Sequence, residues 1–143
     1  DKVFYLLKGN TEKKSIKVEN NISENLGFVF DLNMLESVLR NLISNAVKFT
    51  KPEGSISVSA KTEDGNVIIS VKDTGIGMPD KLKNKIFKLS EIVSRRGTNG
   101  EESTGLGLIL CKDLVERNNG KIWFESEIET GTTFYISLPY VQE

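Results

Sequence analysis

The sequence contains no histidine, one cysteine and one tryptophan among its 143 residues. Without a histidine, any histidine that acts as an acid, a base, a metal ligand or a phosphoacceptor must lie outside this chain. The single cysteine, Cys111, excludes an intrachain disulfide, and we interpret it as a small buried apolar residue in a reducing compartment. There is no signal peptide and no apolar run of about 18 residues, so we expect this chain not to cross a membrane.

An excess of one charge sign is also missing, because 19 Lys and Arg oppose 20 Asp and Glu. The net charge of −1 excludes a broad electrostatic attraction to nucleic acid or to a membrane surface. The length and the hydrophobic fraction of 38% predict one globular domain that folds without a disulfide or a structural metal. The chain opens on Asp1 rather than on Met, so we expect it to be a piece of a longer protein.

Hydrophobic periodicity and turn residues predict an α+β order of elements. Asp31 is a good N-cap for a helix that ends near Thr50, ahead of Pro52. Other elements are expected as strands at 15–18 and 27–30, a hairpin of 56–60 and 67–71, helices at 79–87 and 104–118, a loop at 88–103, and strands at 122–125 and 133–138. This order predicts a two-layer α/β sandwich with about three helices on one face of a mixed sheet of about five strands, rather than a Rossmann fold.

One face of the predicted helix at 31–50 carries Ser37, Asn41, Asn45 and Lys48, which fall within about 80° of each other. Asparagine is a poor helix former, so two asparagines four residues apart need an explanation. Carboxamide oxygens suit a hard divalent cation, and a lysine supplies a positive charge for phosphate. A plain solvated helix face would explain the same pattern, so this helix alone does not identify a site.

Two further segments are rich in glycine. The segment 73–78 (DTGIGM) follows an alternating strand, and its glycines let the backbone approach a ligand while Asp73 can accept from an adenine amino group. An ordinary Asp-Gly turn is the alternative. The segment 103–108 (STGLGL) opens a helix whose free N–H groups suit phosphate, although Gly107 costs about 1 kcal/mol within a helix. A packing glycine is the alternative there, and no GK[ST] follows, so this is not a Walker A loop.

In this order the segments resemble the ATPase domain shared by gyrase, the heat-shock chaperone, histidine kinases and mismatch-repair proteins. The resemblance is closest to histidine kinases and covers about residues 15–139. Residues 41–50 (NLISNAVKFT) resemble the N box of that family, and residues 73–78 resemble its first glycine box. Ile86-Phe87 resembles the F box, residues 104–108 the second glycine box and residues 131–139 the closing strand.

The resemblance implies the ATP-binding catalytic domain of a two-component sensor histidine kinase, with a Bergerat-type fold, ATP and Mg²⁺. It implies transfer of the γ-phosphate to a histidine on a separate helical domain, by positioning and charge stabilisation. The implied catalytic residues are Asn45, which is also the Mg²⁺ ligand, and Lys48. Asp73 would recognise adenine, and further nucleotide contacts are implied at Asn41, Phe49, Gly75, Gly77, Thr104, Gly105, Leu106, Gly107, Leu108 and Thr133.

The resemblance also implies how the parent protein is organised. Residues 1–14 would end a linker helix from a missing dimerisation and phosphoacceptor domain, residues 15–143 would form the catalytic domain, and residues 88–104 would form a mobile ATP lid. The implied partners are that domain and, indirectly, a response regulator receiver domain, without nucleic acid or direct membrane contact. We expect a cytoplasmic domain, whether or not its parent is anchored in the inner membrane. Because the acceptor histidine is absent, the isolated chain should bind nucleotide without autophosphorylating.

Three other functions stay open: a degenerate nucleotide-sensing module, an anti-sigma-type serine kinase and an ATP-driven clamp. Intact Asn45 and Asp73 weigh against the degenerate module. A clamp ATPase needs a water-activating acid near Asn41, but Ser37 stands one turn before it and Glu36 lies about 100° round the helix. A serine kinase would need no upstream helical hairpin with a histidine.

Overall fold

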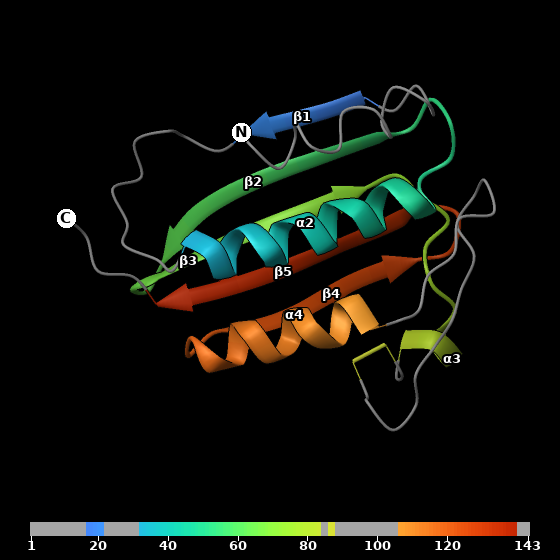
Figure 1. Cartoon of the computed structure of the whole chain (residues 1–143). Coiled ribbons are helices and arrows are strands. Elements are labelled where there is room, and N and C mark those ends of the chain that lie inside the picture. Colours follow the sequence, from blue (N-terminus) through green and yellow to red (C-terminus); the bar gives the residue numbers. More distant parts are fainter. Residues whose placement is uncertain (1–16, 22–31, 84–85, 88–105, 140–143) are drawn as a thin grey trace.

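The computed structural model describes residues 17–21, 32–83, 86–87 and 106–139, and within them five strands form one sheet (Figure 1). The strand order is β1-β2-β3-β5-β4. Strand β1 pairs in parallel with β2, and the other three pairings are antiparallel, which makes the sheet mixed as predicted. The strands are β1 (Lys17–Asn21), β2 (Ser55–Glu63), β3 (Asn66–Asp73), β4 (Lys121–Glu127) and β5 (Gly131–Pro139).

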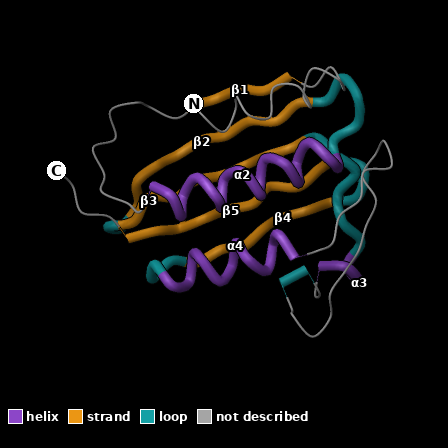
Figure 2. Tube along the Cα trace, in the orientation of Figure 1, coloured by secondary structure: helices purple, strands orange, loops and turns teal. Residues whose placement is uncertain are grey.

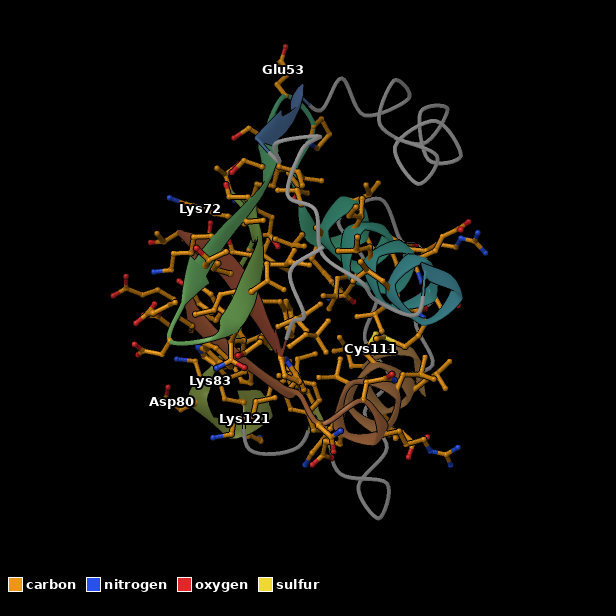
Figure 3. All side chains as sticks on the ribbon, turned by 90° about the vertical axis from the view of Figure 1, so that its left-hand side faces the viewer. Glu53, Lys72, Asp80, Lys83, Cys111 and Lys121 are labelled. Carbon is orange, nitrogen blue, oxygen red and sulfur yellow. The ribbon has the colours of Figure 1, made fainter. Side chains whose placement is uncertain are left out.

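Two long helices cover one face of this sheet. They are α2 (Leu32–Phe49) and α4 (Leu106–Arg117), and they lie beside each other over the strands (Figures 1 and 3). A third helix, α3 (Asp80–Lys83), is a single turn near the end of β4. The predicted two-layer α+β sandwich is thereby confirmed. No helix in the described part of the chain is long and apolar enough to span a membrane.

The core lies between the two helices and the sheet, because alternate strand residues point toward the helices. Val71, Phe134 and Ile136 are buried on that face, and Val38 and Leu42 of α2 are buried against them. Burying a side chain of this size contributes about 1.5–3 kcal/mol of folding free energy, so the alternation fixes which face of each strand meets the helices.

Cys111 belongs to the same core. Its side chain is fully buried in α4, and its Sγ lies 3.7 Å from the carbonyl oxygen of Val38 in α2. Burial raises the pKa of the Cys111 thiol to about 12, because the apolar surroundings disfavour the thiolate. The thiol therefore stays protonated and unreactive, and the sequence interpretation of Cys111 as a packing residue is confirmed.

Several local predictions are confirmed. The helix predicted at 31–50 is α2, and the hairpin of β2 and β3 turns at Asp64 and Gly65, whose φ angles of 49° and 80° fit a two-residue hairpin turn of mirror-image type. The final strands form an antiparallel pair, β4 and β5, as the alternation predicted. Residues 1–14, 27–30, 88–104 and the N-cap Asp31 lie outside the described residues.

Two boundaries differ from the prediction. The first strand is Lys17–Asn21 rather than 15–18. The helix predicted at 79–87 is only the turn α3, and Ile86 and Phe87 lie in a turn beyond it. The Phe87 ring packs against Phe124 and Phe134, with centroid separations of 5.9 and 6.4 Å, and Ile86 is buried as well. Ile86 and Phe87 thus pack into the core from a turn rather than from a helix.

Candidate functional site

The loops that follow α2, β3 and β4 meet at one end of the sheet (Figure 2). The N–H of Ile76 donates to the carbonyl oxygen of Phe49 in α2 over 3.0 Å. The N–H of Glu129, in the β4–β5 turn, donates to the carbonyl oxygen of Ile76 over 2.9 Å. Lys51 and Glu129 add an exposed salt bridge of 2.6 Å between Nζ and Oε2. The loop 74–79 is therefore held between the end of α2 and the β4–β5 turn.

The two glycines of this loop are required by close backbone contacts. A Cβ atom on Gly75 would collide with the carbonyl oxygen of Phe49, and one on Gly77 would collide with the carbonyl oxygen of Glu127. Gly77 also has a φ of 67°, in the left-handed region that side chains disfavour. Both glycines thus fix the path of the loop after Asp73, and their contact with a nucleotide stays a prediction.

Asp73 ends β3 and is buried, with 5% of its surface exposed. Its Oδ1 accepts the N–H of Gly75 over 2.8 Å and the N–H of Thr132 over 3.2 Å. Backbone N–H donors stabilise the ionised carboxylate and fix its direction. A buried, oriented acceptor of this kind can select a ligand that offers a hydrogen-bond donor.

The two threonines of β5 point to opposite faces of the sheet. Thr132 pairs with Asp73, is buried on the helix-covered face and donates its N–H to the carboxylate. Thr133 pairs with Lys72 and therefore faces the uncovered side, because successive strand side chains alternate. The structure brings Thr132, and not the predicted Thr133, to the Asp73 side chain.

A hydroxyl pair that the sequence did not single out lies next to Asp73. The Oγ of Ser126, in β4, accepts the N–H of Met78 over 2.9 Å and lies 2.7 Å from Oγ1 of Thr132. The only local signal is that Ser126 continues the alternation of Ile122 and Phe124, which places a polar residue in an inward position. Pairing between β4 and β5 was needed to show its partners.

The start of α4 approaches the polar side of α2. The Nδ2 of Asn41 donates to the carbonyl oxygen of Ser37 over 3.0 Å, which fixes the carboxamide. A Cβ atom on Gly107 would lie only 3.2 Å from Oδ1 of Asn41. The glycine in this helix therefore permits close packing of α4 on Asn41, which supports the packing interpretation left open by the sequence.

Other predicted site residues lie on the same two helices. Asn45, Lys48 and Phe49 are half-buried in the second half of α2, and Leu108 is half-buried in α4. Leu106 is the first residue of α4. Thr104 and Gly105 lie outside the described residues.

A pocket of about 610 Å³ opens beside the Asp73 loop. It receives no residue from α2, so it is separate from the Asn41 and Lys48 side of the site. The described residues that line it carry both charge signs, and they are Lys72, Asp73, Met78, Asp80, Lys83, Glu125, Ser126, Glu127, Ile128, Thr130, Gly131, Thr132 and Thr133. Figure 3 shows Lys72, Asp80 and Lys83 on the side of the sheet away from the helices.

Comparison with known proteins shows the family to which the chain belongs. Residues 30–142 match the family described as histidine kinase-, DNA gyrase B-, and HSP90-like ATPases, and the chain belongs to this family. The sensor protein SrrB of Staphylococcus aureus strain MRSA252 is 37% identical over 112 residues, which cover 78% of this chain and 19% of SrrB. The chain thus spans about a fifth of the length of this curated relative.

Solved structures of histidine kinases share the fold. The nucleotide-free catalytic domain of histidine kinase ThkA matches with a TM-score of 0.80 and 30% identity, over 96% of this chain and 88% of that one. Full-length ShkA in complex with AMPPNP matches with a TM-score of 0.82 and 28% identity, over 99% of this chain and 29% of that one. The chain is therefore an ATP-binding domain of the histidine kinase type.

Proposed function

We propose that this chain is the catalytic half of a two-component sensor histidine kinase, which donates the γ-phosphate of ATP to a histidine on a separate helical domain. The observation that carries the proposal is the meeting of three motifs around the second half of α2. The loop after Asp73 contacts this helix at Phe49, and the start of α4 contacts it at Asn41. Asn45 lies between these two contacts along the helix.

The adenine base would be recognised by Asp73, because its buried carboxylate accepts hydrogen bonds and the base offers an exocyclic amino group. Gly75 and Gly77, whose close backbone contacts fix the path of the loop after Asp73, would shape the adenine site. Thr132, which is tied to the same carboxylate, is a better candidate than Thr133 for the residue beside the base. Phe49 at the end of α2 would flank the nucleotide.

The phosphates and Mg²⁺ would lie between α2 and the start of α4. No three His, Cys, Asp or Glu side chains gather into a metal site among the described residues. Mg²⁺ fits such a site nonetheless, since it takes few protein ligands and completes its shell with phosphate oxygens and water. Asn45 would supply a carboxamide oxygen, with Asn41 beside it, and Lys48 would contact phosphate. Residues 104–108 would seat the phosphates at the helix start.

Phosphoryl transfer needs the nucleotide to be held in line with its acceptor and its charge to be stabilised, and these residues can supply both. The acceptor would be the histidine of the parent's own dimerisation domain. Both domains would lie in the cytoplasm. ThkA has been solved in complex with the response regulator TrrA, which supports a receiver domain as the next acceptor.

Asn45→Ala tests the metal assignment. We expect wild-type protein to bind ADP more tightly with Mg²⁺ than with a chelator, as measured by calorimetry. Asn45→Ala should lose most of this Mg²⁺ dependence, with about a tenfold weaker affinity in Mg²⁺, because a carboxamide ligand to the metal is removed. The affinity in chelator should change little.

Asn66→Ala is the matched control, since Asn66 begins β3 at the strand end opposite Asp73. It should keep both affinities. An Asn45→Ala protein that retains the full Mg²⁺ dependence would contradict the metal assignment. A folded wild type that binds no adenine nucleotide at millimolar concentration would contradict the proposed function as a whole.

A further inference from the structure

Ser126 joins the two backbone segments that flank Asp73. It lies in β4, half-buried on the helix-covered face, and its Oγ accepts the N–H of Met78 over 2.9 Å. The same Oγ lies 2.7 Å from Oγ1 of Thr132 and 3.3 Å from the carbonyl oxygen of Gly131. Met78 ends the motif that starts at Asp73, and Thr132 donates its N–H to the carboxylate.

The hydrogen-bonding capacity of Ser126 matches these neighbours. A hydroxyl has one proton and two lone pairs. If Ser126 accepts from Met78 and from the hydroxyl of Thr132, its own proton is directed to the carbonyl oxygen of Gly131, and every partner is satisfied. The side chain then links the loop after Asp73 to Gly131 and Thr132, the first two residues of β5, and no donor is missing or left over.

The hydrogen bond that depends on this bridge is the weaker of the two on Asp73. Thr132 N–H reaches Oδ1 over 3.2 Å, near the long end of the normal range, whereas Gly75 N–H reaches it over 2.8 Å. Loss of the Ser126 hydroxyl would remove one link between the start of β5 and the loop, so the long Thr132 bond would lengthen first. The carboxylate would then lose part of its fixed direction.

We propose that Ser126 is a positioning residue that sets adenine selectivity by holding the carboxylate of Asp73 in place through Thr132. This inference rests on the proposed function, since it requires Asp73 to read the base. Because Ser126 acts through the carboxylate of Asp73, its loss should change selectivity for the base and not binding of the phosphates.

The test compares ADP with inosine diphosphate, which carries a carbonyl group where ADP has the exocyclic amino group. Both are titrated by calorimetry into wild-type protein and into Ser126→Ala. ADP affinity should fall about three- to tenfold, the loss expected for one neutral hydrogen bond, while inosine diphosphate affinity changes less than about twofold. The preference for ADP should therefore shrink by at least about 1.5-fold, and by about three- to tenfold where inosine diphosphate affinity does not change.

Two further variants separate positioning from general destabilisation. Ser70→Ala removes a serine hydroxyl from the other face of β3 and should leave the preference unchanged. Ser126→Thr restores a hydroxyl and should restore the preference. Equal losses for both nucleotides in Ser126→Ala, or no loss for either, would overturn the inference while the proposed function stands. A wild type without any preference for ADP would overturn the assignment of Asp73 and this inference with it.

Discussion

Asp73→Asn should weaken ADP binding at least about 100-fold and leave the protein folded. The asparagine keeps an oxygen that can accept the N–H groups of Gly75 and Thr132, so the local backbone should be retained. Its NH₂ group replaces a carboxylate oxygen, however, and opposes the amino group of adenine with a second donor. Loss of a charged hydrogen bond together with an unpaired donor corresponds to about 2.7 kcal/mol or more. Calorimetric titration with ADP and Mg²⁺ measures the loss.

The control for this variant is its thermal unfolding midpoint, which should stay close to that of the wild type. A midpoint well below that of the wild type would mean that the variant has damaged the fold rather than the base contact. Asp73→Asn with near wild-type ADP affinity would show that the carboxylate does not read the base.

Gly77→Ala should lower the free energy of unfolding by about 2–4 kcal/mol. The φ of 67° disfavours any side chain, and the new Cβ atom would collide with the carbonyl oxygen of Glu127. The loop after Asp73 would have to move away from the β4–β5 turn, so nucleotide binding should fall too. Urea unfolding followed by circular dichroism measures the free energy.

Gly65→Ala is the matched control, because it separates backbone strain from collision. Gly65 has a φ of 80°, but among the described residues no atom beyond its two chain neighbours lies within 4 Å of the position a Cβ would take. This variant should cost only about 1–2 kcal/mol, the strain of the left-handed conformation. Equal losses of unfolding free energy in the two variants would mean that the collision with the carbonyl oxygen of Glu127 adds no cost.

Local chemistry made much of this fold predictable. The period of apolar residues defines α2, and the Asp64-Gly65 pair defines the β2–β3 hairpin, because these signals act over a few residues. The Asp73 motif was recognised by its place at a strand end, where a carboxylate followed by glycines suits a binding loop.

Long-range packing decided what the sequence could not predict. Whether Thr132 or Thr133 faces Asp73 depends on the register of β5 against β3. A shift of the register by one residue would move every side chain of β5 to the other face of the sheet. Ser126 gained its partners only through the β4–β5 pairing, and Gly107 gained its reason only through the contact of α4 with Asn41. The contacts of Phe87 likewise involve strands distant in sequence, because its ring packs against Phe124 and Phe134.

In the proposed function, this chain passes phosphate from ATP to a histidine that it does not contain. The most direct measurement mixes it with the histidine-bearing helical domain of its parent, ATP and Mg²⁺, and follows acid-labile, alkali-stable phosphate on that domain. We expect phosphorylation of the helical domain, none on this chain alone, and none with Asn45→Ala. Tight ADP binding without any phosphate on the helical domain would contradict the kinase assignment and leave a nucleotide-sensing module.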